Sequence, residues 1–173
     1  MITVRAAALD DWAGLREIRL TALRSTPDAY GSTYARESAF DEAVWRERAS
    51  SAAGRQTFLA VDENGQLVGT ATGLADPEEP ADVRLLVGMW IDPGYRGQGL
   101  VDRLTAEVVA WARGDGGRTL RLDVSVGNQV ARAAYLRNGF RPTGERAPMP
   151  GRPHVLEEAM TLSLNDTVSG RDE

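Results

Sequence analysis

The chain has 173 residues, of which 42% are apolar, enough for a single domain with a buried core. It contains no cysteine and one histidine, which excludes disulfides, a thiol nucleophile and clusters of these metal ligands, and we predict no bound metal. The formal net charge of −5 argues against a broad nucleic-acid-binding surface. The first residues lack the apolar core of a signal peptide, and no apolar run is long enough to cross a bilayer, so we expect a cytoplasmic protein without a membrane partner.

The first part of the sequence predicts a strand and two helices. A strand is expected over residues 2–5, followed by a helix from a cap at Asp10 to about residue 23, because apolar residues recur there near helical spacing. Asp41 is expected to cap a second, short helix. The segment 25–37 between these helices mixes turn formers, tyrosines and charges, which is typical either of a substrate-facing loop or of an ordinary connection.

The rest of the chain predicts strands that alternate with helices. Strands over 57–61 and 67–74 flank Asn64-Gly65, a strong signal for a tight hairpin. We then expect an acidic loop over 76–82, a strand over 83–91, a helix over 99–113, a strand over 120–124, a helix from Asn128 to Asn138, a strand over 140–145, a proline-rich loop over 146–153 and a strand over 155–164. This order predicts one α/β domain over residues 1–164, with a mixed sheet flanked by helices, and a polar C-terminal tail over 165–173.

The segment 87–101 combines an apolar strand, a glycine-rich turn and a helix start. The turn contains Arg96 and three glycines, Gly94, Gly97 and Gly99. Backbone N–H groups at a helix start have no partner within the helix, and the helix dipole adds partial positive charge, so the segment predicts a phosphate site. The spacing of the glycines does not match the dinucleotide-binding motif, and no Gly-Lys-Ser/Thr of a nucleotide-triphosphate loop follows.

Two motifs resemble those of the Gcn5-related N-acetyltransferases (GNAT). Residues 96–101, Arg-Gly-Gln-Gly-Leu-Val, resemble motif A of that family, commonly written Arg/Gln-x-x-Gly-x-Gly/Ala. Residues 128–140, Asn-x-x-Ala-x-x-x-Tyr-x-x-x-Gly-Phe, resemble its second cofactor motif. The resemblance covers residues 2–164 and implies a twisted mixed sheet with splayed central strands. It also implies an N-acetyltransferase that moves an acetyl group from acetyl-CoA to a primary amine of a small molecule or peptide, by direct attack in a ternary complex.

The resemblance implies three groups of cofactor-binding residues. Gly97 and Gly99 are expected to let the backbone amides of Gln98, Gly99, Leu100 and Val101 approach the pyrophosphate closely, and Arg96 is expected to add positive charge at the mouth of this site. The preceding strand is expected to bind the pantetheine arm like an added strand, and to polarise the thioester carbonyl with a free amide, through Met89, Trp90 and Ile91. Asn128 is expected to hydrogen-bond the pantetheine amides or nearby main chain.

Tyr135 is the predicted catalytic residue. By the resemblance, its hydroxyl lies near the thioester sulfur and protonates the leaving thiolate, and a phenol with a reference pKa of about 10 stays protonated at neutral pH. The alternative is a tyrosine that only packs beneath the cofactor. No general base is apparent; the candidates are a water relay or one of Glu37, Asp123, Glu157 and His154. Either the acceptor pocket or the core is expected to contain the aromatic residues Tyr30, Tyr34 and Trp90.

Two positions depart from the family pattern. Val101 stands where Gly or Ala is preferred, and Asp102 adds a carboxylate beside the expected pyrophosphate, although an acid also suits the first turn of a helix. Arg137 is either a ligand of the adenosine phosphate or an exposed arginine without a specific role. The departures keep open a non-catalytic acyl-CoA binding or sensing module and, more weakly, an interaction domain that has lost the cofactor. The resemblance also leaves a homodimer open.

Overall fold

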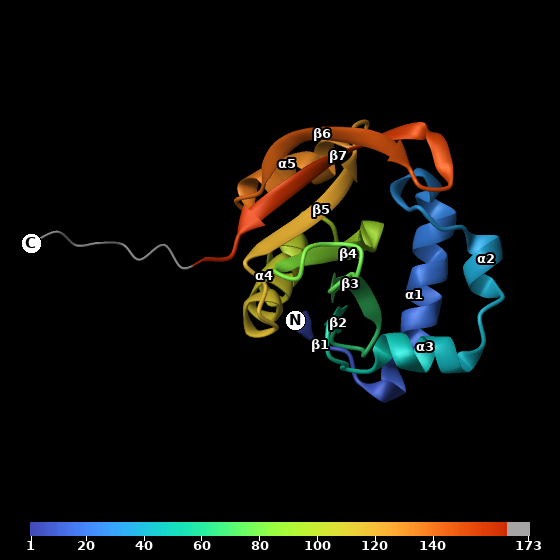
Figure 1. Cartoon of the computed structure of the whole chain (residues 1–173). Helices are drawn as coiled ribbons and strands as arrows, with labels where there is room; N and C mark the ends of the chain where they lie inside the picture. The colour runs from blue at the N-terminus through green and yellow to red at the C-terminus, as the bar shows by residue number, and fades with distance from the viewer. Residues whose placement is uncertain (166–173) are drawn as a thin grey trace, which may run out of the picture.

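The computed structural model describes residues 1–165, which form one seven-stranded sheet with helices on both faces (Figure 1). The strands are β1 (Thr3–Ala6), β2 (Arg55–Val61), β3 (Leu67–Leu74), β4 (Val83–Ile91), β5 (Thr119–Ser125), β6 (Arg141–Met149) and β7 (Arg152–Ser163), in the spatial order β1-β2-β3-β4-β5-β7-β6. The helices are α1 (Trp12–Ser25), α2 (Tyr34–Ser38), α3 (Glu42–Ala49), α4 (Leu100–Gly114) and α5 (Gln129–Arg137). The predicted α/β class with a mixed sheet is confirmed.

The sheet splits between its two parallel strands. β4 and β5 pair only at their beginnings, residues 83–85 against 119–121, whereas the other neighbouring strands are antiparallel. Beyond this pairing β4 continues to Ile91 and β5 to Ser125. In Figure 1 the strands β5, β7 and β6 form the upper part of the molecule and β1 to β4 the lower part. The predicted splayed central strands are therefore found, at the junction of β4 and β5.

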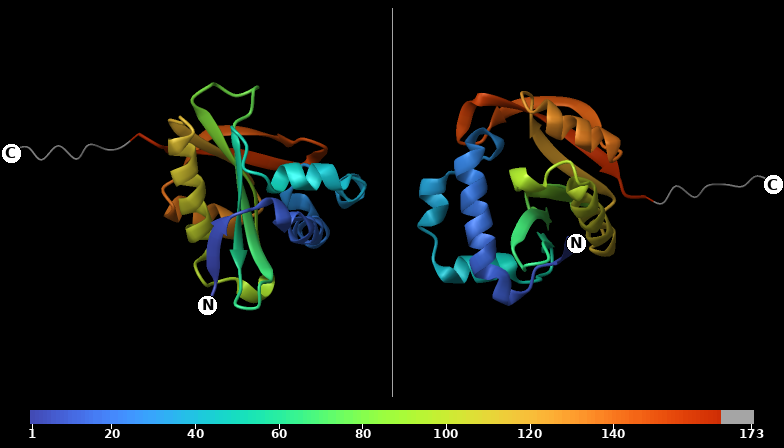
Figure 2. Two further views of the ribbon diagram at one scale, coloured as in Figure 1. Left: turned by 90° about the horizontal axis from the view of Figure 1, so that it is seen from below. Right: turned by 180° about the vertical axis from the view of Figure 1, so that it is seen from behind.

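Helices on the two faces of the sheet enclose separate apolar cores (Figure 2). α4 and α5 pack on one face, and α1 and α3 pack on the other. Successive side chains of a strand point to opposite faces, so in β2 Phe58 lies in the core beneath α4 and Leu59 in the core beneath α1. α4 approaches the sheet closely at Gly73, where a Cβ would lie 2.2 Å from the Trp111 ring. Because Gly73 has no side chain, α4 packs directly against β3.

The start of α1 differs from the prediction. Asp10 does not cap the helix, because it lies in a short 3-10 turn and α1 begins at Trp12 without a side-chain cap. The next carboxylate, that of Asp11, is tied to the preceding strand. It accepts hydrogen bonds from the Ala8 N–H at 2.7 Å and from the Arg5 guanidinium at 2.7 and 2.8 Å. Asp11 therefore fixes the turn into α1, and its side chain does not cap the helix.

The segment 25–37 contains helical turns. A 3-10 turn spans Pro27–Ala29, and α2 begins inside the segment. Thr33 caps α2, because its hydroxyl accepts a hydrogen bond from the N–H of Arg36 at 3.2 Å. The short helix was missed because five residues carry too little periodicity to be recognised.

The predicted loop over 146–153 is wrong. β6 and β7 occupy most of it and form a hairpin whose turn includes Gly151, at a φ of +75°. The prolines suggested a loop, but a strand tolerates proline at the edge of a sheet, where its missing N–H is not needed by a neighbour. β6 is the last strand of the sheet and carries Pro142 and Pro148.

The other predicted elements lie close to their expected bounds. The hairpin of β2 and β3 is confirmed, with Gly65 in its turn at a φ of +81°. Among residues 1–165, none of the helices has both the length and the apolar character needed to cross a membrane. Residues 166–173 of the predicted polar tail lie outside the described part of the chain, so the domain boundary stays a prediction.

Candidate active site

A cavity of about 490 Å³ lies where β4 and β5 separate. Its walls include residues 86–89 of β4 and 122–125 of β5. α1 and the segment after it contribute Arg19 and Tyr30, and α5 contributes Tyr135. The cavity therefore collects side chains from both halves of the split sheet and from helices on both of its faces.

β4 carries a bulge at the wall of this cavity. The pairing with β3 shifts register between Thr70 and Thr72, so that Gly88 and Met89 together stand opposite one residue of β3. Gly88 has a φ of +64°, a conformation that favours glycine. A bulge leaves backbone groups of its extra residue outside the strand ladder. The bulge therefore interrupts the ladder beside the cavity, where Gly88 and Met89 form part of the wall.

The three predicted pantetheine-binding residues of β4 have different surroundings. Met89 lines the cavity, and its backbone carbonyl accepts a hydrogen bond from the Tyr30 hydroxyl at 3.0 Å. Trp90 is buried in the core beneath α1 and Ile91 in the core beneath α4. Trp90 is thus a core residue, and these two residues have only their backbone to offer a cofactor.

The glycine-rich turn leaves its backbone open. Gly97 and Gly99 have φ values of +76° and +72°, and a Cβ at either would meet nothing within 4 Å. Residues 96–99 are exposed, whereas the Leu100 side chain is buried, so Leu100 offers a ligand only its amide. Arg96 lies against the end of β4, whose last carbonyl accepts a hydrogen bond from its Nε at 3.2 Å. Because the N-cap residue of α4 is Gly99, which has no side chain to bind the first amides of the helix, the turn fits a pyrophosphate.

The two departures from the motif are accommodated within the protein. Val101 is half-buried and packs against the core beneath α4. Asp102 accepts hydrogen bonds from Arg137 and Asn138, both at 2.7 Å. The bond from Arg137 lowers the pKa of Asp102 and keeps it ionised, with its charge balanced by the guanidinium. The ion pair also joins the start of α4 to the end of α5, the two helices that carry the motifs.

Asn128 and Tyr135 both line the cavity, from α5 and its N-terminal cap. The Asn128 side-chain oxygen accepts the Ala131 N–H at 3.1 Å, which leaves its NH₂ group for a ligand. Tyr135 is 7% exposed and packs edge-on against Phe140, with ring centroids 5.8 Å apart. Burial raises the pKa of Tyr135, so its hydroxyl is protonated at neutral pH and can donate a proton.

Two of the four candidate bases line the cavity. Asp123 and Glu157 come from the neighbouring strands β5 and β7. Burial raises the pKa of Glu157, and the nearby charge of Asp123 raises it further, which makes Glu157 a better proton acceptor than an ordinary glutamate. Asp123 receives a hydrogen bond from Arg121 at 3.3 Å. The structure therefore brings two carboxylates to the part of the cavity formed by β5 and β7.

The other two candidates have different surroundings. Glu37 is 2% exposed; burial alone would raise its pKa, but hydrogen bonds from Arg19 and Arg48 hold the pKa at about 2. A carboxylate held this way is a weak proton acceptor. His154 is exposed, with its Nε2 3.7 Å from Asp28. Neither residue is part of the cavity wall.

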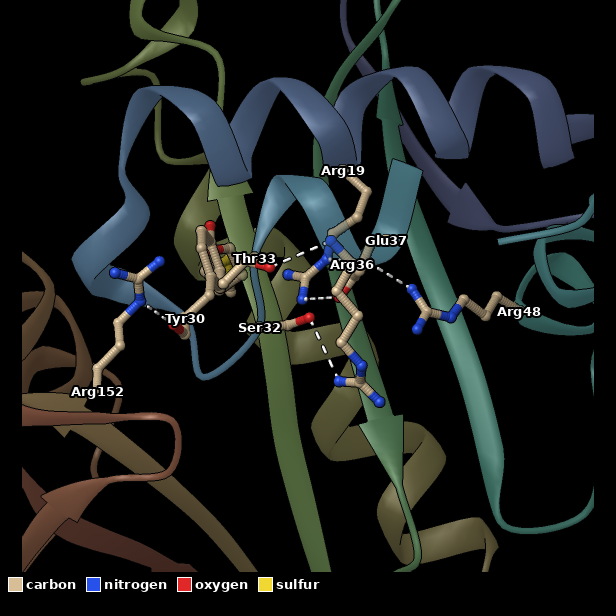
Figure 3. Close-up of polar contacts among 9 residues, drawn as sticks. Arg19, Tyr30, Ser32, Thr33, Arg36, Glu37, Arg48 and Arg152 are labelled. Atoms are coloured by element: carbon tan, nitrogen blue, oxygen red, sulfur yellow. Dashed lines mark hydrogen bonds and ion pairs between the residues drawn. The ribbon is translucent and has the colours of Figure 1, made fainter. Parts of the chain in front are cut away.

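Three arginines of the cavity wall were not predicted from the sequence: Arg19 of α1, Arg48 of α3 and Arg55 of β2. Figure 3 shows Arg19 and Arg48 converging on Glu37, with N–O distances of 2.8 to 3.1 Å. The Arg19 guanidinium also lies 4.7 Å from the centre of the Tyr30 ring. One signal was available, since Arg19 follows Leu15 by four residues and so falls on the apolar face of α1.

Comparison with known proteins agrees with this site. The family model for the acetyltransferase (GNAT) family matches residues 12–140. An aminoglycoside N(6')-acetyltransferase type 1 from Stenotrophomonas maltophilia is 34% identical over 91 residues, which cover 50% of this chain and 60% of that protein. N-acetyltransferase 8F1 from Rattus norvegicus is 30% identical over 92 residues, covering 52% and 42%. The chain thus spans less than two thirds of the length of these relatives.

Solved structures share the fold over nearly the whole chain. A GNAT-family acetyltransferase from Streptococcus pneumoniae has a TM-score of 0.78 at 24% identity, covering 95% of this chain and 100% of that one. The yncA protein from Salmonella typhimurium, solved with its cofactor acetyl-CoA, has a TM-score of 0.77 at 22% identity, covering 96% and 95%. With a family model that matches most of its length, this chain belongs to the GNAT acetyltransferase family.

Proposed function

We propose that the protein is an N-acetyltransferase that moves an acetyl group from acetyl-CoA to a primary amine of a small molecule or peptide. The observation that carries this proposal is the cavity between the separated ends of β4 and β5, which contains both a buried tyrosine and a pair of carboxylates. The glycine-rich turn lies at the end of the same strand, β4. Family membership and the relatives named N-acetyltransferases support the same reaction class.

The residues that would hold acetyl-CoA lie along β4 and the starts of α4 and α5. The pyrophosphate would lie on the turn formed by Arg96, Gly97, Gln98, Gly99, Leu100 and Val101. The pantetheine arm would run along the bulged end of β4, at Met89, Trp90 and Ile91, with the free NH₂ group of Asn128 beside it. Acetyl-CoA, when bound there, supplies the acetyl group as a thioester.

Tyr135 and Glu157 would move the two protons of the reaction. Glu157, with Asp123 beside it, takes the proton that the amine loses as its nitrogen bonds to the acetyl carbon. Tyr135 gives its hydroxyl proton to the departing sulfur, and burial suits it to this role because the phenol remains protonated. The backbone amides at the bulge of Gly88 and Met89 would stabilise the charge that develops on the carbonyl oxygen.

The test is a thiol-release assay with acetyl-CoA and a panel of primary amines, run beside calorimetric measurement of acetyl-CoA binding. Binding together with acceptor-dependent thiol release is the expected result. Binding without release from any amine or peptide would favour an acyl-CoA sensing module. Absence of binding would remove both functions.

A further inference from the structure

The cavity has a cationic side that the acetyl-transfer reaction does not use. Arg19, Arg48 and Arg55 lie in its wall, on the face of the sheet that α1 and α3 cover, and we call them the arginine side. α4 and its N-terminal turn lie on the opposite face. A thioester that enters from the α4 face therefore meets an acceptor that enters from the arginine side.

The arginines outnumber the carboxylate that binds them. Arg19 donates to both oxygens of Glu37, and Arg48 donates to one of them (Figure 3). Both oxygens of Glu37 thereby accept hydrogen bonds, and Glu37 forms none with Arg55. Glu47, exposed on α3, adds a second negative charge nearby, which still leaves three cations against two carboxylates.

Arg55 is the unsatisfied member of this group. Its Nε is buried and has no hydrogen-bond partner among residues 1–165. Burial lowers the pKa of Arg55, and the positive charge of Arg48 lowers it further, because both disfavour the charged form of the guanidinium group. A buried charged donor without a partner costs free energy, and an anion bound beside it would recover that cost.

The opposite wall carries the complementary charge. Asp123 and Glu157 face the cavity from β5 and β7, whereas the arginine side belongs to α1, α3 and β2. Tyr30 lines the same cavity and is fixed by the bond from its hydroxyl to the Met89 carbonyl and by a bond from Arg152 Nε to its own carbonyl at 3.2 Å. One cavity thus offers acids to an ammonium group and guanidinium groups to an anion.

From this charge separation we infer that the acceptor is an amino acid or another small amine that also carries a carboxylate. Its carboxylate binds Arg55, with Arg19 and Arg48 beside it, and its amino group lies toward Asp123 and Glu157. The inference rests on the proposed function, since it names the acceptor class of that reaction. A polycationic amine is disfavoured, because its second ammonium group would meet the arginine side.

The experiment compares matched acceptors: a panel of amino acids, the corresponding amino acid amides, and a linear polyamine. In the parent protein we expect kcat/KM for the acids to exceed that for their amides by about tenfold or more, from the loss of a charge-assisted hydrogen bond. Arg55→Gln should lower kcat/KM for the acids by about 10- to 100-fold, mainly through KM, and leave the amides nearly unaffected. Arg55→Lys should restore part of the preference.

Arg118→Gln is the matched control, because it removes the same charge from an exposed residue outside the cavity wall. Both Gln variants should bind acetyl-CoA like the parent. Equal use of acids and amides, preference for the polyamine, or an equal loss for acids and amides in Arg55→Gln would each overturn the inference and leave acetyl transfer intact. If no acceptor releases thiol, the proposed function fails, and calorimetry with an acid and its amide still decides whether the arginine side binds a carboxylate.

Discussion

The two sides of the cavity are built in different ways. The side that we propose for the cofactor uses the backbone: a bulge in β4, two glycines with positive φ and the first amides of α4, all within one continuous segment. The side that we propose for the acceptor uses side chains from α1, α3, β2, β5 and β7, which are far apart in the sequence. We call them the cofactor side and the acceptor side. A backbone site suits a ligand that is the same for a whole family, whereas side chains can be exchanged singly to suit one acceptor.

Tyr135→Phe tests the residue at which the two sides meet, and we expect its effect to be the largest. Loss of the proton donor should lower kcat by about 100- to 10,000-fold, the usual contribution of general acid–base catalysis. The calorimetric affinity for acetyl-CoA should stay close to that of the parent, because the ring remains. Tyr34→Phe, at a partly exposed tyrosine outside the cavity, is the control. Equal turnover in Tyr135→Phe and the parent would remove the acid role.

Glu37→Gln tests the ion pairs by which Glu37 holds Arg19 and Arg48 on the acceptor side. Removing one partner of a buried ion pair should lower the free energy of unfolding by about 3–5 kcal/mol, because Arg19 and Arg48 lose their carboxylate. Urea denaturation at pH 7 measures this loss. A raised KM for the acceptor with unchanged acetyl-CoA affinity would show that the two sides are independent.

The same residue gives a pH dependence of stability. The pKa of Glu37 is about 2 in the folded protein, against an ordinary value of 4.5. Its stabilising contribution is therefore complete above pH 4.5 and is lost as the pH falls toward 2. Melting temperatures of the parent should fall across this window, and those of Glu37→Gln should fall less. Parallel curves for the two proteins would contradict the assignment.

Gly99→Val tests the cofactor side. A β-branched residue is strained at a φ of +72°, and relaxing the strain would move the amides at the start of α4. We expect acetyl-CoA affinity to fall by about 10- to 100-fold, the value of a hydrogen bond to a charged group. Gly114→Ala is the control, since it adds a methyl group in open space at the other end of α4. Unchanged affinity in Gly99→Val would show that acetyl-CoA binding does not depend on the backbone conformation of the turn, and would contradict the difference between the two sides.

Asp102→Asn should have the smallest effect. Asp102 and Arg137 have side chains 41% and 60% exposed, so their ion pair is worth about 1 kcal/mol or less. Loss of the carboxylate leaves a net positive charge beside the turn, and acetyl-CoA binding should strengthen by a few-fold at low ionic strength. Calorimetry at low and high salt measures this change, which should disappear as salt screens the charge. Weaker binding would mean that the link between α4 and α5 matters more than the charge.

What the sequence predicted follows the same division. The glycine-rich turn, Asn128 and Tyr135 are local patterns; the order of strands and helices predicted the mixed sheet, and the family resemblance implied its splayed central strands. The sequence carried a signal for Arg19 alone, because the chain separation between Arg19 and Arg55 does not indicate that both line one side of the same cavity. Glu37 was predicted only as a candidate base, and its burial and its two arginine partners are visible only in the folded protein.

Local signals also failed where tertiary context overrode them. The prolines of β6 suggested a loop, yet the strand forms because β7 pairs with it and no neighbour requires hydrogen bonds on its outer side. Asp10 resembled a helix cap, but a 3-10 turn placed Asp11 at the junction with Arg5. Both errors concern ends of elements, where one competing contact decides the outcome.

The edges of the sheet have a consequence for how copies of the protein meet. β1 is four residues long, and β6 is interrupted by Pro142, by Pro148 and by Gly144 at a φ of +86°. Neither edge offers the long, regular row of N–H donors that templates the addition of a foreign strand. The two edges of this sheet therefore resist aggregation by strand pairing at high concentration.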